Sequence, residues 1–166
     1  MPLPWPSISI SRTPARRARL KPTVPKVLSK EDEVTQTMEE KNKALVLEAF
    51  ETLFNKRDYV AAERFWSPNY IQHSAHSPPG REGLFNMIKG LPDHFRYENG
   101  LVVANGDYVL LHGRFSGIGL PANWIVADIV RLENGKLAEH WDVIQDEVKK
   151  EASRSGLPMF GDRFPD

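Results

Sequence analysis

The stretch Trp124–Val143, WIVADIVRLENGKLAEHWDV, predicts a β-hairpin with the most unusual polar residues of the chain. Asn134-Gly135 lies between two alternating apolar runs and favours a two-residue type I′ turn. That turn pairs Glu133 with Lys136 and sets Asp128 opposite Trp141. In this register, the face of Asp128 also holds Trp124, Val126, Val130, Glu139, Trp141 and Val143.

A single bulge in the hairpin would change this assignment. It would bring Asp128 beside His140 or Asp142, because one extra residue moves the following side chains to the opposite face. The sequence leaves both registers open. In either register, His140 and Asp142 share one face of their strand.

The segments before the hairpin add strands and then helices. Period-2 patterns predict strands over 95–104 and 108–116, with a bend at Asn99-Gly100 and a turn at Asn105-Gly106-Asp107. Apolar residues at helical spacing predict helices over 39–55 and 81–91, and Asp58 can cap a short helix between them. Tyr70 to His73 reads as a short extended piece. We therefore expect an α+β domain, a cone-shaped roll in which N-terminal helices pack against a strongly curved, mainly antiparallel sheet.

The two ends of the chain differ from this central region. Residues 1–30 contain seven basic side chains, six prolines and no acid, so 1–36 is predicted to be a disordered, basic, proline-rich arm. The folded domain is expected over 37–146 and a C-terminal tail over 147–166. No apolar stretch suits a secretory signal or a bilayer span. We expect a cytoplasmic protein, or an organellar one if the arm is a transit peptide.

Composition excludes several function classes. The 166 residues carry 22 basic and 22 acidic side chains, which does not suggest a nucleic-acid-binding protein. There is no cysteine, so thiol catalysis and cysteine-based metal sites are ruled out. We expect no nucleic acid and no membrane among the partners.

The hairpin supplies candidate acid–base residues. Asp128 has apolar neighbours along its strand, and burial of a carboxylate there would raise its pKa towards neutrality. The alternative is a structural aspartate that accepts hydrogen bonds. Asp142 lies two residues from His140 and could orient the imidazole, although a surface strand pair would look the same.

Further histidines and aromatic residues complete the candidate site. His73 and His76 have a spacing that could bind metal, but no further ligands are evident, so we expect no metal. The sequence has no phosphate loop and no dinucleotide-binding motif, so we expect no other cofactor. His73 is expected at the mouth of the cone, as a catalytic residue. The side chains expected to contact a hydrophobic small-molecule ligand are Trp66, Tyr70, His112, Phe115, Trp124 and Trp141.

The order of elements, Tyr70-Ile-Gln-His73 and the stretch 128–143 resemble SnoaL-like proteins of the nuclear transport factor 2-like superfamily. The resemblance covers 39–146. It implies a cone-shaped α+β fold and a homodimer packed through the sheet. Members include polyketide cyclases, ketosteroid isomerase, scytalone dehydratase and an epoxide hydrolase, most of which act without a cofactor. It places the acid–base candidates at Asp128, His140 and Asp142, with His73 near the mouth.

These observations lead to one expected function and three rival functions. We expect an acid–base enzyme, a lyase or isomerase, that moves a proton next to the carbonyl of a hydrophobic, polyketide-like substrate in a cyclisation, isomerisation or dehydration. One carboxylate would remove the proton, and His140 or His73 would donate to the enolate oxygen. A water-activating hydrolase would instead use Asp128 and Asp142 with Arg114 or Arg131. A non-catalytic binding domain would need only the cavity, and a protein-interaction module would use the face of the sheet.

Overall fold

A computed structural model describes residues 36–165. Helix α1 (Met38–Phe50) begins at Thr37, whose hydroxyl accepts from the Glu40 backbone while Glu40 reaches back to the Thr37 N–H. This reciprocal pair satisfies two helix-terminal donors. Helix α1 continues into a π-helical turn, η1 (Glu51–Asn55), and not into the regular helix expected to residue 55. The predicted basic arm, 1–36, lies almost wholly outside the described residues.

Two short helices and a first strand follow. Asp58 caps α2 (Tyr59–Ala62) as predicted, by accepting from the Ala61 N–H. Strand β1 (Trp66–Gln72) precedes α3 (Gly80–Lys89). The remaining strands are β2 (Arg96–Asn105), β3 (Tyr108–Ser116), β4 (Trp124–Glu133) and β5 (Lys136–Asp146), and a 3₁₀ turn, η2 (Lys150–Ala152), lies in the C-terminal tail.

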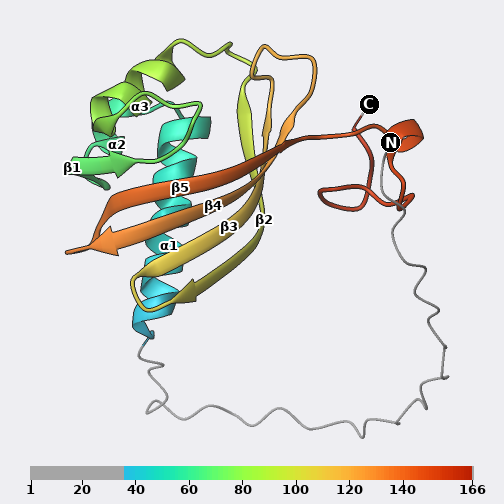
Figure 1. Cartoon of the computed structure of the whole chain (residues 1–166). Helices are drawn as coiled ribbons and strands as arrows, with labels where there is room; N and C mark the ends of the chain where they lie inside the picture. Colours follow the sequence, from blue (N-terminus) through green and yellow to red (C-terminus); the bar gives the residue numbers. More distant parts are fainter. Residues whose placement is uncertain (1–35, 166) are drawn as a thin grey trace, which may run out of the picture. The chain divides into compact units, whose positions relative to one another are not determined.

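The sheet has the order β1-β5-β4-β3-β2, and only β1 and β5 are parallel. Helices α1, α2 and α3 all lie on one side of it, with α1 running across the curved strands (Figure 1). The predicted α+β class is thus confirmed. The predicted bend at Asn99-Gly100 is a register shift in β2, and Asn134 and Gly135 both have positive φ, as a type I′ turn requires.

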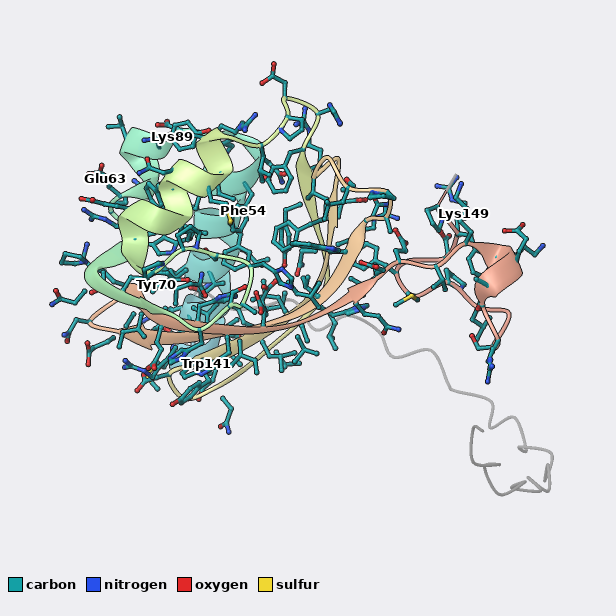
Figure 2. The ribbon with its side chains drawn as sticks, turned by 45° about the horizontal axis from the view of Figure 1, so that its top comes forward. Phe54, Glu63, Tyr70, Lys89, Trp141 and Lys149 are labelled. Atoms are coloured by element: carbon teal, nitrogen blue, oxygen red, sulfur yellow. The ribbon has the colours of Figure 1, made fainter. Side chains whose placement is uncertain are left out.

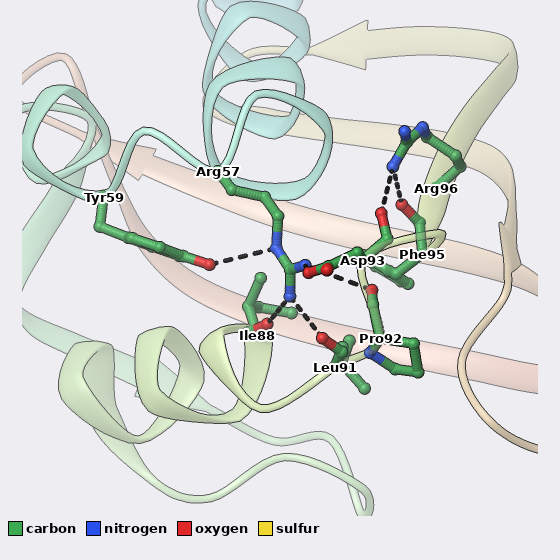
Figure 3. A network of polar contacts seen from close by, with 8 residues as sticks. All are labelled: Arg57, Tyr59, Ile88, Leu91, Pro92, Asp93, Phe95 and Arg96. Carbon is green, nitrogen blue, oxygen red and sulfur yellow. Dashed lines mark hydrogen bonds and ion pairs between the residues drawn. The ribbon is translucent and has the colours of Figure 1, made fainter.

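Arg57 joins the end of η1 to the end of α3. Its guanidinium donates to the backbone oxygens of Ile88, Leu91 and Pro92 at 2.7, 2.7 and 3.2 Å (Figure 3). The Ile88 and Pro92 oxygens also accept from the backbone N–H groups of Leu91 and Phe95, so Arg57 adds a second donor to these two and supplies the donor of the Leu91 oxygen. This clamp holds α3 over the concave face of the sheet.

The core lies between the helices and the sheet. Phe50, Phe54, Phe95, Tyr97 and Phe115 form a cluster of aromatic rings with centroid separations of 4.8–6.3 Å. A Cβ on Gly113 would lie 2.5 Å from the Tyr97 ring, so glycine permits this close packing. The helices and the sheet together leave part of the space between them unfilled, and this space contains the candidate site.

Candidate active site

A bulge in β5 decides which side chains face the helices. Leu132 pairs with Leu137, but the next pair is Arg131 with Glu139, so Ala138 is the extra residue. Asp128 consequently lies opposite Asp142, not opposite Trp141. The straight register that placed Trp141, Glu139 and Val143 beside Asp128 is therefore wrong, and the bulged alternative is the one observed.

Asp128 and His140 form a buried pair on adjacent strands. Asp128 Oδ1 lies 3.0 Å from His140 Nε2, and the two residues are 2% and 8% exposed. Burial raises the pKa of Asp128 above its ordinary value; His140 opposes this shift, while the Asp142 charge adds to it. The Tyr97 hydroxyl is 3.5 Å from Asp128 Oδ2, a long contact. The pair can therefore hold or accept a proton in an apolar environment.

Gln72 contacts the other side of the imidazole. Parallel pairing of β1 with β5 aligns Gln72 with His140, and Gln72 Oε1 lies 2.8 Å from His140 Nδ1. The same oxygen accepts from the Ser74 N–H at 3.0 Å, and Gln72 Nε2 donates to the Tyr70 hydroxyl at 3.3 Å. Both imidazole nitrogens thus have partners.

These polar groups lie in the wall of an apolar cavity of about 280 Å³. Phe50 and Phe54 reach it from α1 and η1, and α3 contributes Leu84, Met87 and Ile88. Figure 2 shows Phe54 and Tyr70 on the helix side of the sheet. Asp142 also lines the cavity. Of the side chains predicted to contact a ligand, four lie in its wall: Trp66, Tyr70, Phe115 and Trp124.

Three predicted site residues lie elsewhere. Trp141 follows His140 on β5 and therefore points to the opposite face, away from the helices (Figure 2). His73 lies on that face too, stacked on Trp141 at 4.8 Å and 2.8 Å from Glu139, so its expected place at the mouth of the cavity is wrong. His112 also misses the cavity, because its ring packs against Phe160 of the C-terminal tail. Instead, His76 lies in the cavity wall, where it contacts Trp124.

The two arginines considered for water activation are also remote. Arg114 pairs with Glu98 and Glu147, and Arg131 pairs with Glu139 on the outer face. Neither is among the cavity-lining residues. In the described part of the chain, no three His, Cys, Asp or Glu side chains cluster as a metal site would require.

Sequence reasoning missed Gln72, Ser74 and Tyr97 as parts of the site. Gln72 and Ser74 flank His73, and only the pairing of β1 with β5 shows that Gln72 faces inward. For Tyr97 a signal existed, since the alternation of β2 puts it on the buried side with Phe95 and Phe115. A tyrosine at such a position usually has a partner for its hydroxyl.

The chain belongs to the SnoaL-like polyketide cyclase family, whose sequence profile matches residues 44–149. The predicted resemblance is thereby confirmed. No curated protein sequence gives a significant match. Within residues 36–165, no helix combines the length and apolar composition needed to span a membrane.

Solved structures share the fold. A provisionally assigned ketosteroid isomerase from Kribbella flavida superposes with a TM-score of 0.59 at 16% identity, covering 76% of this chain and 97% of its own. AclR from Streptomyces galilaeus, a provisionally assigned hydroxylase, superposes with a TM-score of 0.52 at 25% identity, covering 64% of this chain and 79% of its own. An LEH-like epoxide hydrolase from M. tuberculosis superposes with a TM-score of 0.54 at 13% identity, covering 66% of this chain and 86% of its own.

Proposed function

We propose that the protein is a cofactor-independent acid–base enzyme acting on a hydrophobic, carbonyl-bearing small molecule. The observation that carries this proposal is the Asp128–His140 pair in the wall of an otherwise apolar cavity. A cavity of this kind binds apolar ligands and has few polar groups to orient them. Membership of the SnoaL-like polyketide cyclase family supports a substrate of the polyketide type.

The proposed chemistry is proton transfer beside a carbonyl group. Asp128 removes a proton from the carbon next to the carbonyl, and the electron pair of the broken C–H bond moves to the carbonyl oxygen. His140 or the Tyr70 hydroxyl donates a hydrogen bond to that oxygen; burial raises the pKa of Tyr70, so its phenol stays protonated. The enolate then attacks a second carbonyl, takes back the proton at another carbon, or expels a β-hydroxyl group as water.

A hydrolase of the epoxide hydrolase type is a second candidate function, because the cavity wall contains two facing carboxylates. Asp128 and Asp142 face each other across β4 and β5 and both line the cavity. Two carboxylates could orient a water molecule, but the arginine required by that mechanism is missing from the described cavity wall. We therefore favour proton transfer, and epoxide substrates distinguish the two reactions.

The test is proton exchange in heavy water. We would incubate the full-length protein with hydrophobic ketones and 1,3-diketones and follow deuterium uptake at the carbon beside the carbonyl. Wild type should accelerate exchange, and Asp128→Asn should slow it by about 10²–10⁴-fold, because the amide cannot accept the proton. Asp146→Asn, on the exposed end of the same hairpin, is the matched control and should exchange like wild type.

Different outcomes would replace the proposal. Opening of aromatic and terpenoid epoxides without ketone exchange would favour the hydrolase. Ketone binding with equal affinity by wild type and Asp128→Asn, without exchange above the solvent rate, would identify a non-catalytic binding domain. Normal exchange by Asp128→Asn would show that Asp128 is not the base.

A further inference from the structure

The Ser74 backbone N–H determines how the Gln72 amide is oriented. A backbone N–H can only donate, and it lies 3.0 Å from the Gln72 side-chain oxygen. A flipped amide would set the Gln72 NH₂ group against this donor. The oxygen of Gln72 is therefore the atom that faces both Ser74 and His140.

This orientation fixes one proton of His140. Gln72 Oε1 is an acceptor 2.8 Å from His140 Nδ1, so Nδ1 must carry a hydrogen to bond to it. The other nitrogen, Nε2, lies 3.0 Å from Asp128 Oδ1. A carboxylate oxygen facing a bare Nε2 would repel it, and two protons placed between these atoms would clash. A favourable contact needs one proton between them.

We propose that Gln72 is a positioning residue that holds His140 protonated at Nδ1, so that Asp128 and His140 share a single proton between Oδ1 and Nε2. The shared proton gives the pair zero net charge in both of its forms, aspartate with imidazolium or aspartic acid with imidazole. Zero net charge suits a site as buried as this one, because an isolated charge there is costly. The catalytic meaning of the pair rests on the proposed function, but the proton arrangement is a property of the free protein.

The groups around the pair are consistent with this arrangement. Asp142 on β5 is the nearest further acid, and its charge favours retention of the shared proton by Asp128. From β2, the Tyr97 hydroxyl faces Asp128 Oδ2. From β1, the Trp66 indole N–H lies near the Tyr70 oxygen but forms no hydrogen bond among the described residues. No arginine or lysine lines the described cavity wall, and of its two histidines, His76 and His140, it is His140 that contacts Asp128.

The same amide also directs Tyr70. Because Gln72 Nε2 donates to the Tyr70 oxygen, the phenol cannot give its own proton to Gln72. Within residues 36–165, no acceptor takes that proton, and Tyr70 lines the cavity. Tyr70 is thus left with an O–H to offer to a ligand oxygen, while His140 is held by its two partners.

Nitrogen NMR on histidine-labelled, full-length protein tests the proposal directly. The ¹⁵N shifts distinguish a protonated ring nitrogen from a bare one, and loss of signals in His140→Gln assigns this residue among the five histidines. Wild type should show a protonated Nδ1 throughout the neutral range. A spectrum with a bare Nδ1 and the proton on Nε2 alone would overturn the proposal.

Variants of Gln72 separate positioning from general structure. In Gln72→Leu, Nδ1 loses its acceptor, so its proton should be released to solvent, which leaves Nδ1 bare and the remaining proton on Nε2, facing Asp128. Gln72→Glu keeps an acceptor oxygen and should keep the wild-type pattern. Gln145→Leu removes an exposed glutamine from the same sheet and serves as the control. An unchanged His140 spectrum in Gln72→Leu, or an equal change in Gln145→Leu, would contradict the proposal.

These spectra need no substrate, so they are independent of the exchange assay. If wild type has the predicted proton on Nδ1 but catalyses no exchange, the proposed function fails and the positioning role of Gln72 stands. If exchange depends on Asp128 while His140 carries its proton on Nε2 alone, the function stands and the proposal for Gln72 fails.

Discussion

Asp128 is a carboxyl group held where water cannot solvate its charge. Its pKa in the folded protein is raised above the ordinary value of 3.8, chiefly by burial. The folded state therefore binds this proton more tightly than the unfolded chain does. The free energy of unfolding that this proton contributes is fully present below the pKa of the unfolded chain. It is lost as the pH rises through the higher pKa of the folded state.

Asp128→Asn should show this linkage, because the amide cannot ionise. We expect the unfolding free energy of the variant to increase relative to wild type as the pH rises from acid to neutral. The slope is about 1.4 kcal/mol per pH unit within the window between the two pKa values. Urea denaturation at a series of pH values measures it. Asp146→Asn should differ from wild type by a constant amount, and a flat or falling difference for Asp128→Asn would refute the explanation.

At the same scale, the sequence was sufficient to single out Asp128 but not its partners. A carboxylate between Val126 and Val130 is unusual enough to be noticed in any register. Gln72 lies on a different strand, 68 residues from His140, and no local pattern connects the two. Side chains that meet through parallel pairing of distant segments are fixed by tertiary structure alone.

At the scale of elements, β5 shows why the straight register put the wrong β5 side chains on the face of Asp128. The bulge lies at Ala138, between Leu137 and Glu139, and both Leu137 and Ala138 are buried. Neither a glycine nor a polar residue marks the position. The strand boundaries and the turn could be predicted, because Asn134-Gly135 has a strong local preference. The bulge could not, because two small or apolar residues fit either register.

The Arg57 clamp is the element-scale feature with the clearest energetic consequence. Arg57→Ala would leave the Leu91 carbonyl without its donor and would remove the second donor of the Ile88 and Pro92 carbonyls, so it should lower the unfolding free energy by about 2 kcal/mol. Arg64→Ala removes an exposed pair with Glu48 and should cost less than about 1 kcal/mol. Chemical denaturation of both variants makes the comparison. Equal, small losses would show that water replaces the guanidinium at the end of α3.

At the scale of the whole molecule, the sheet carries an apolar row on the face away from the helices. Successive strands pair Val103 with Leu110, Leu110 with Ile129, and Ile129 with Trp141. Exposed Tyr108 and Val143 lie beside the row. Arg131 and Glu139 on the same face carry opposite charges, which would suit a second copy of the face. We therefore propose the homodimer that the family resemblance implies, with this face as its interface.

Light scattering during size exclusion measures the oligomeric state of the full chain. Wild type should elute as a dimer, and Val143→Lys should be monomeric, because it sets two ammonium groups in the apolar interface. Val60→Lys changes an exposed valine on α2 and should remain dimeric. A monomeric wild type, or a dimeric Val143→Lys, would show that this face is not the interface.

The general architecture was the feature of the molecule that the sequence predicted best. Period-2 segments joined by Asn-Gly turns and preceded by amphipathic helices define an α+β roll without knowledge of any side-chain contact. The division of polar residues between the two faces needed the actual register. His73 was misplaced for this reason, since β1 is short and its single parallel partner decides which of its residues face inward.

The positions of three tryptophans give the molecule two separate optical signals. Trp66 and Trp124 line the cavity, whereas Trp141 lies on the opposite face with the His73 ring flat against it. A ligand in the cavity changes the surroundings of the first two, while a molecule bound to the outer face of the sheet changes those of the third. Replacement of Trp5 by Phe, combined either with Trp141→Phe or with Trp66→Phe and Trp124→Phe, would therefore let one fluorimeter follow occupancy of the cavity and events on the outer sheet face independently, without any attached dye.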